Sequence, residues 1–187
     1  MKARILISFV LVLLLASCGS SRNARKQKKN PGVEQLETKP VILMGDFNEP
    51  SFLDWTENTK NMFNHYGVAI PWHNTVKLHK NGFIDVFREF YPNEIENPGF
   101  TWPSATSKQK STSWTPLADE RDRVDYIFYK GKNIKIKDVA LVGPKETYVY
   151  NKVEITNTDR EKFLANNLPW PSDHKAVYTK LLFTFKN

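Results

Sequence analysis

Two polar residues with oxygen-bearing side chains follow an apolar run in the segment PVILMGDFNEP, residues 40–50. The apolar run, residues 41–44, predicts a buried strand. Because residues i and i+2 of an extended chain point the same way, Asp46 and Asn48 would present a carboxylate and an amide together at the end of this strand. A plain turn explains the same residues, since Asp and Asn also stop strands by bonding their own backbone. The segment alone leaves a chemical site and a turn as alternatives.

Two later segments place further ionisable side chains beside predicted strands. In DRVDYIFY, residues 122–129, Asp125 lies on the opposite side of the strand from its two neighbours, where a buried carboxylate needs a partner. In WPSDHKAV, residues 170–177, Asp173 and His174 stand directly before the last strand. Taken singly, Asp125 is equally well explained as a surface strand residue, and the Pro-Ser-Asp-His segment as a capped turn.

The order of four motifs distinguishes between these alternatives. GDFN, then Thr101-Trp102, then RVDYIF and then SDH resemble the endonuclease/exonuclease/phosphatase superfamily, and the resemblance runs from about residue 40 to residue 185. It implies an α+β fold, part of a deoxyribonuclease I-like two-sheet αββα sandwich, of which this chain would form the C-terminal half. It also implies a divalent-metal site where the strands end.

The resemblance implies a role for each polar residue of these motifs. Asp46 is similar to the aspartate that orients or deprotonates the attacking water, and Asn48 to the neighbour that holds the metal or the phosphoryl oxygens. Asp173 is similar to the last metal-ligating aspartate. His174 matches the histidine that contacts the scissile phosphate, and Asp125 the carboxylate that orients that histidine. Asp46, Asn48, Asp125 and His174 are thus the expected catalytic residues, and Asp46, Asn48 and Asp173 the expected metal ligands.

These residue types suit phosphoester hydrolysis. Charge on the nonbridging oxygens must be neutralised during attack by water, which Mg²⁺ (or Mn²⁺) does and an imidazolium assists. Hard oxygen ligands suit such an ion, and a carboxylate on one ring nitrogen favours the charged imidazole. Trp102 and Arg123, which stand in the motifs TW and RVDYIF that carry the resemblance, are the expected substrate-binding residues.

The resemblance covers only the second half of the family pattern. Family members carry a metal-binding glutamate, an asparagine and a histidine on strands well before GDFN, whereas here Glu34 and Glu37 are the carboxylates in front of that strand and lie too close to it. Two classes of function therefore stay open. One is a metal-dependent phosphoesterase that cleaves phosphodiester or phosphomonoester bonds outside the cytoplasm. The alternative is a truncated, inactive, lipid-anchored remnant or binding protein, or one piece of a split enzyme whose first half is separately encoded.

The N-terminal segment predicts export and lipidation. Residues 1–17 combine a basic start, an apolar run and small residues, which is typical of a secretory signal peptide. The sequence Leu-Ala-Ser-Cys-Gly that ends it resembles a bacterial lipobox, which makes Cys18 the expected lipidation site and the cell envelope the expected location. Residues 18–39 are expected to form a lipidated basic tether, and residues 40–187 the endonuclease/exonuclease/phosphatase-like domain.

The charge distribution bears on the substrate. The chain has a formal net charge of +7, but seven basic residues before Asn30 account for this excess, and the rest carries 20 basic and 20 acidic residues. A domain without net charge lacks a bulk attraction for polyanions, which weakens a nuclease. The candidate substrates are a nucleic acid, a phospholipid or a small phosphoester, and the aromatic-rich loop on a membrane anchor is compatible with either of the last two.

The remaining pattern predicts the elements that position the motifs. Apolar spacing predicts helices over residues 51–63 and 82–92, and the Pro, Ser, Thr and Trp content predicts a long loop over residues 92–120. Strands are expected over residues 122–130, 134–143 and 175–185, the last with Val177, Leu181 and Phe183 on a face that lacks full cover in half a sandwich. A zinc site made of His65, His73 and His79 is a weak alternative, because their spacing fits no common ligand pattern.

Overall fold

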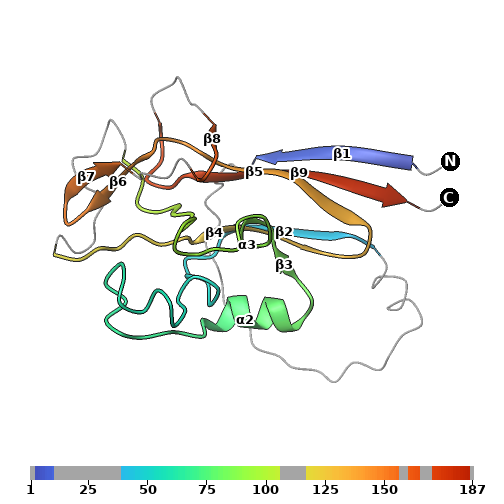
Figure 1. The fold of residues 1–187 in the computed structure, drawn as a ribbon. Coiled ribbons are helices and arrows are strands. Elements are labelled where there is room, and N and C mark those ends of the chain that lie inside the picture. The colour runs from blue at the N-terminus through green and yellow to red at the C-terminus, as the bar shows by residue number, and fades with distance from the viewer. Residues whose placement is uncertain (1–2, 11–38, 106–116, 156–159, 165–169, 186–187) are drawn as a thin grey trace, which may run out of the picture.

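Two β-sheets face one another in the computed structural model, which describes residues 3–10, 39–105, 117–155, 160–164 and 170–185 (Figure 1). The first sheet has the strand order β1-β9-β5-β8, made of β1 (Ala3–Val10), β9 (Ala176–Phe185), β5 (Ile134–Val142) and β8 (Phe163–Leu164). The second has the order β2-β4-β3, made of β2 (Val41–Asp46), β4 (Asp125–Lys130) and β3 (Ile84–Asp85). The predicted α+β fold with two sheets is confirmed, as are the four predicted strands, with small shifts of their ends. The first of them, β2, was predicted to be buried but is only partly buried.

The helices are short, and they flank β3 of the second sheet in the sequence. Helix α2 (His73–Lys80) lies on the side of β2-β4-β3 that faces away from the first sheet, and α3 (Val86–Phe90) follows β3 directly (Figure 1). A separate hairpin is formed by β6 (Glu146–Val149) and β7 (Lys152–Ile155). Among the helices that the structure describes, none has the length and apolar character needed to cross a membrane.

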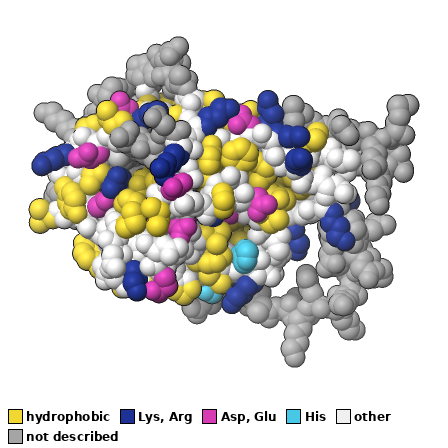
Figure 2. All heavy atoms as spheres, viewed as in Figure 1, with side chains coloured by type: hydrophobic (Ala, Val, Ile, Leu, Met, Phe, Trp, Pro, Cys, Tyr) yellow, Lys and Arg dark blue, Asp and Glu magenta, His cyan; other side chains and the backbone are white. Residues whose placement is uncertain are grey.

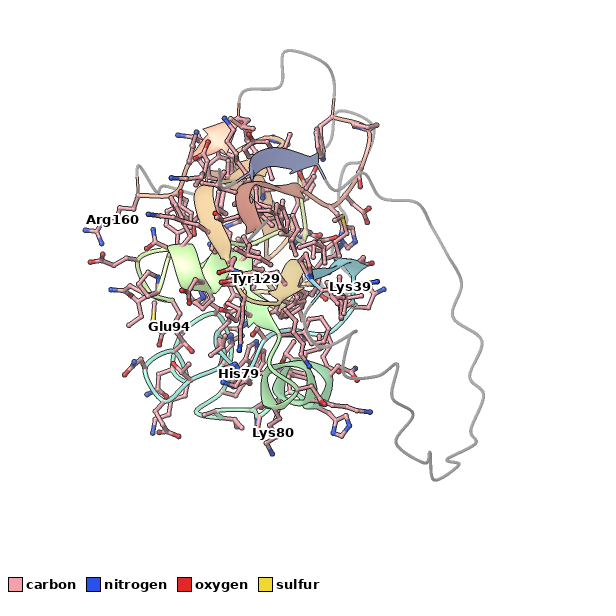
Figure 3. All side chains as sticks on the ribbon, turned by 90° about the vertical axis from the view of Figure 1, so that its right-hand side faces the viewer. Lys39, His79, Lys80, Glu94, Tyr129 and Arg160 are labelled. Carbon is pink, nitrogen blue, oxygen red and sulfur yellow. The ribbon has the colours of Figure 1, made fainter. Side chains whose placement is uncertain are left out.

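The hydrophobic core fills the space between the two sheets. Figure 3 shows Tyr129 of β4 between the two layers, well away from His79 and Lys80 on α2. The central cluster draws on both sheets and on α3, with Val86, Phe87, Ile127, Tyr129, Val139, Leu141 and Val177 as its buried members. The expectation that the inner face of β9 lacks cover is wrong, because Val177, Leu181 and Phe183 are only 1%, 0% and 5% exposed. Each such side chain contributes about 1.5–3 kcal/mol by its burial.

Strand β1 pairs with one edge of β9. The two strands run antiparallel with a register from Ala3 opposite Phe185 to Val10 opposite Tyr178. An apolar segment is well suited to this place, because it satisfies an edge that would otherwise leave a row of backbone groups unpaired. Residues 1–17, the predicted signal peptide, include β1. Their removal during export stays a prediction. Cys18 and most of the predicted tether lie outside the described residues.

The expected helix over residues 51–63 is wrong: the segment forms consecutive turns. The hydroxyl of Thr59 accepts a hydrogen bond from the backbone N–H of Thr56 (2.9 Å) and donates one to the carbonyl of Asp54 (2.6 Å). Side chains that bond the backbone in this way compete with helical hydrogen bonds. Phe63 also has a left-handed backbone, with φ of 51°, which ends any helix at that point.

The expected helix over residues 82–92 is shorter in the structure. It begins after Asp85, whose carboxylate accepts hydrogen bonds from the N–H groups of Phe87 and Arg88 and so caps α3. Ile84 and Asp85 pair instead with β4. Helix α2 has no counterpart among the predictions, because its sequence HNTVKLHK offers no apolar stripe and buries one residue, Thr75. The predicted long loop is confirmed for the described residues between α3 and β4.

Candidate active site

The site begins where β2 and β4 end side by side. Asp46 and Asp125 lie directly opposite one another in the antiparallel register. The Oδ1 atom of Asp46 accepts a hydrogen bond of 2.8 Å from the backbone N–H of Asn48, which has a left-handed φ of 47°. A turn therefore forms, as one interpretation of this segment expected, and it holds Asp46 and Asn48 beside a second carboxylate, Asp125.

Asp125 is joined to His174 across the site. The distance from Asp125 Oδ2 to His174 Nδ1 is 2.9 Å, and the two side chains are 0% and 14% exposed. Burial alone lowers the pKa of His174, but the hydrogen bond and the charge of Asp125, aided by Asp46 and Asp173, outweigh burial and raise the pKa. The buried carboxylate of Asp125 thus favours the charged form of His174.

The turn that carries Asp173 and His174 is anchored to the segment after Phe100. The N–H of Ser104 donates to the carbonyl of Asp173 (2.6 Å), and the N–H of Lys175 donates to the carbonyl of Thr101 (2.7 Å). The Thr101 hydroxyl in turn accepts hydrogen bonds from the backbone N–H groups of Val124 and Asp125. Thr101 therefore ties the Asp125 strand to the His174 turn, a positioning role that the sequence did not reveal.

A cavity of about 530 Å³ opens beside His174. Asn48, Asp173 and Trp102 line it together with His174, so that the structure brings four predicted site residues to one surface. Trp102 was predicted to bind substrate, and its place in the cavity wall is compatible with that prediction. The other walls carry ring side chains and carboxylates, which are Trp55, Phe63, Tyr66, Asp119, Glu120 and Asp122.

The acceptor atoms of the site suit a divalent cation. Ligand atoms of Asp46, Asp125 and His174 lie within 4.8 Å of one another. The second oxygen of Asp125, Oδ1, is buried without a hydrogen-bond donor among the described residues. Because Nδ1 of His174 is engaged by Asp125, the carboxylates rather than the imidazole are the better ligands for a hard ion. Asp173 is outside this group of three but lines the adjoining cavity.

Arg123 occupies a different place from the one predicted. Its side chain is 0% exposed and bonds Asp54 (Nη2 to Oδ2, 2.7 Å) and Asp85 (Nη1 to Oδ2, 2.7 Å). Arg88 pairs with the other oxygen of Asp54 at 2.8 Å. The prediction that Arg123 binds substrate is therefore corrected. Its guanidinium is buried and forms ion pairs with two carboxylates, so it does not reach a ligand. The spacing of these residues in the sequence gives no signal for such a network.

The weak zinc alternative gains no support from the described residues. His65 is buried and stacks on Trp55 with ring centroids 3.7 Å apart, while His79 packs against the edge of Phe52. His73 begins α2. The one group of potential metal ligands found among the described residues contains none of these three histidines.

Comparison with known proteins agrees with the geometry. Residues 23–174 match the Endonuclease/Exonuclease/phosphatase family, and the chain therefore belongs to this family. It is also 36% identical over 151 residues to "Uncharacterized protein F14F9.5" of Caenorhabditis elegans. That alignment covers 81% of this chain and 43% of the relative, so the chain spans less than half the length of this protein.

Proposed function

We propose that the chain is the site-bearing part of a divalent-metal-dependent phosphoesterase that cleaves phosphodiester or phosphomonoester bonds. Membership of the family supports a hydrolase of the phosphoesterase or nuclease-like kind. The observation that carries the proposal is the buried Asp125–His174 pair, which opens on the cavity beside Asp46 and Asn48. A carboxylate-held imidazolium, a second carboxylate and an amide are the groups that a phosphoryl centre requires.

Each residue has a distinct task in this proposal. Asp125 fixes Nδ1 of His174, which leaves Nε2 as the nitrogen that donates to a nonbridging phosphoryl oxygen. Asp46 accepts a proton from, or orients, the attacking water, and its link to the Asn48 backbone holds the carboxylate in place. Asn48 and Asp173 with Asp46 would hold Mg²⁺ or Mn²⁺. When bound, such an ion supplies charge neutralisation for the phosphoryl oxygens.

The test is hydrolysis of bis-p-nitrophenyl phosphate and p-nitrophenyl phosphate by the purified chain, with Mg²⁺, with Mn²⁺ and with chelator. The expected result is metal-dependent turnover that Asp46→Ala and His174→Ala each reduce by at least about a hundredfold, the scale of a lost acid–base group. Glu57→Gln is the matched control, because Glu57 is an exposed carboxylate paired with Lys60 and is not among the residues that line the cavity. Turnover that survives both site substitutions would contradict the proposal.

A second candidate is that the chain needs a partner segment for full activity. The observation that favours it is the alignment with 43% of the C. elegans relative, which leaves more than half of that protein without a counterpart in this chain. The resemblance implies that a metal-binding glutamate belongs to such a segment. Adding a separately expressed first half of a family member should raise turnover in the unsubstituted chain but not in His174→Ala. An inactive binding protein would show no gain.

We also propose that the protein acts in the cell envelope, anchored through acylated Cys18. The support is the lipobox-like sequence after an apolar run with a basic flank. Two or more acyl chains give stable anchoring to a membrane. The partner of the acyl chains would be the lipid bilayer. The substrate would then be a phosphoester that is present outside the cytoplasm.

A further inference from the structure

The cavity beside His174 extends along a wall of aromatic rings. Trp55 is fixed there by three contacts: its ring stacks on buried His65 with centroids 3.7 Å apart, Trp72 meets it edge-on at 5.4 Å, and Nε1 donates to Asp122 at 2.8 Å. Tyr66 also lines the cavity and is 79% exposed. Trp55 therefore offers a preorganised ring beside the more exposed ring of Tyr66, and the faces of both rings carry the negative part of the ring quadrupole.

The same wall carries acidic groups. Among the described residues, the cavity lining includes the carboxylates of Asp119, Glu120, Asp122 and Asp173, and no Lys or Arg. His174, its single basic group in that part of the chain, is already paired with buried Asp125. Arg121 neutralises Asp119 through two hydrogen bonds of 2.7 and 2.8 Å. Asp122 and Asp173 are further carboxylates of this wall.

Asp122 is a carboxylate of this wall whose ionised form a bound cation would stabilise. Burial raises its pKa to about 7, the charges of Asp54 and Asp119 act in the same direction, and the hydrogen bond from Trp55 opposes them. A bound cation would favour its ionised form. A second phosphate of a polynucleotide strand, in contrast, would bring another negative charge against this wall, since successive phosphates lie only about 3.4 Å apart along the axis.

We propose that this cavity binds an organic cation, an alkylammonium group carried by the phosphoester substrate, between its aromatic rings and Asp122. The inference rests on the proposed phosphoesterase function and names its substrate class. Ring faces attract cations that have lost part of their water, and a quaternary ammonium is the cation that aromatic walls bind best. On the face that Figure 2 shows, the described basic and acidic side chains are interspersed.

Binding is tested on the full chain in chelator, so that metal and turnover play no part. Choline is compared with 3,3-dimethylbutan-1-ol, which has the same shape and no charge, by tryptophan fluorescence and calorimetry. Choline is expected to bind at least about tenfold more tightly, and the preference should disappear in Asp122→Asn and weaken in Tyr66→Asn. Asn tolerates the left-handed backbone of residue 66 (φ 54°), so this variant keeps the fold. Equal binding of the two compounds would overturn the inference.

Proton release gives a readout that needs no variant. At pH 7 choline binding should release a fraction of a proton as Asp122 ionises, seen as a binding enthalpy that changes with the buffer. Asp54, Asp119, Glu120, Asp173 and His174 also lie near the cavity, so the release must vanish in Asp122→Asn to support the inference. Release that persists in folded Asp122→Asn would contradict it. Glu57→Gln, a surface carboxylate variant, should bind choline as the unsubstituted chain does.

Hydrolysis assays then distinguish the proposed phosphoesterase function from the inferred ammonium-binding cavity. Turnover of p-nitrophenyl phosphorylcholine in preference to bis-p-nitrophenyl phosphate supports the inference, and added turnover of phosphatidylcholine vesicles identifies a lipid headgroup as the source of the ammonium. Choline binding without any hydrolysis would support the cavity while the proposed function fails. Hydrolysis with no preference for the ammonium-bearing ester would overturn the inference and leave the proposed function standing.

Discussion

Removal of the His174 side chain should destabilise the fold as well as the proposed chemistry. Asp125 is 0% exposed, its Oδ1 has no hydrogen-bond donor among the described residues, and Oδ2 is bonded to His174 at 2.9 Å. His174→Ala leaves this carboxylate buried without its counter-charge, which costs about 3–5 kcal/mol. That is a large share of the total of about 5–15 kcal/mol that holds a domain together.

The assay is urea unfolding at pH 7, followed by tryptophan fluorescence, for His174→Ala, Asp125→Asn and the double variant. The double variant should be more stable than His174→Ala, because it removes the unpaired charge. A loss of less than about 1 kcal/mol in His174→Ala would refute the reasoning, since an ion pair exposed to solvent contributes no more than that. A double variant that is less stable than His174→Ala would refute it as well.

The imidazole titration provides an independent check by NMR. The pKa of His174 should lie above its usual 6.5 and fall in Asp125→Asn, whereas the pKa of His65, lowered mainly by burial, should lie below 6.5 in both proteins. The sign of the linkage follows. The contribution of the His174–Asp125 pair to the free energy of unfolding is fully present below the unfolded-state pKa of His174, and it is lost as pH rises through the folded-state pKa. The pKa of His65 shifts in the opposite direction, so the stability of the protein with neutral His65 is lost as pH falls. A His174 pKa unchanged by Asp125→Asn would contradict the assignment of the pair.

Four further predictions concern other parts of the chain. Burial lowers the pKa of Lys175 to about 8, and no described residue hydrogen-bonds its Nζ. Lys175→Met should therefore add roughly 3 kcal/mol of stability at pH 7, a gain that shrinks as pH rises from 8 toward 10.5, the ordinary value, in urea titrations. Arg123→Met should cost about 3–5 kcal/mol, because it leaves buried Asp85 without its ion-pair partner and Asp54 with Arg88 alone. The KM of the protein that remains folded should not change. Deletion of residues 1–17 should open the β9 edge and cause concentration-dependent association in analytical ultracentrifugation. Labelled palmitate should be incorporated in a bacterial host and be lost in Cys18→Ala; retained label would contradict acylation there.

The strands and the polar side chains of the candidate site could be predicted because their signals are local. The apolar run before Asp46 and the alternation around Val177 each lie within one strand, and the motifs around Asp125 and His174 are short and occur in a recognisable order. A resemblance built on such motifs carries over the residues within them. It also overreached at Arg123, which belongs to one of those motifs but points into the core.

The cavity wall could not be predicted because it is built from contacts between distant segments. Trp55 bonds Asp122 across 67 residues of sequence, and Arg123 bonds Asp54 across 69. These contacts hold residues 51–63 in turns, against the helical spacing of their apolar residues. The cover of the inner face of β9 was missed for a similar reason, since it depends on how closely the β4 layer packs against it.

The measurement that tests the central claim most directly is a crystal structure of the chain grown with Mn²⁺ and inorganic phosphate, with anomalous data that locate the metal. The account predicts an anomalous peak about 2.1 Å from a carboxylate oxygen of Asp46, with Asn48 or Asp173 as a further ligand. It also predicts a phosphate oxygen within hydrogen-bonding distance of His174 Nε2. Metal and phosphate bound away from these residues, or phosphate that leaves His174 without a contact, would contradict the account.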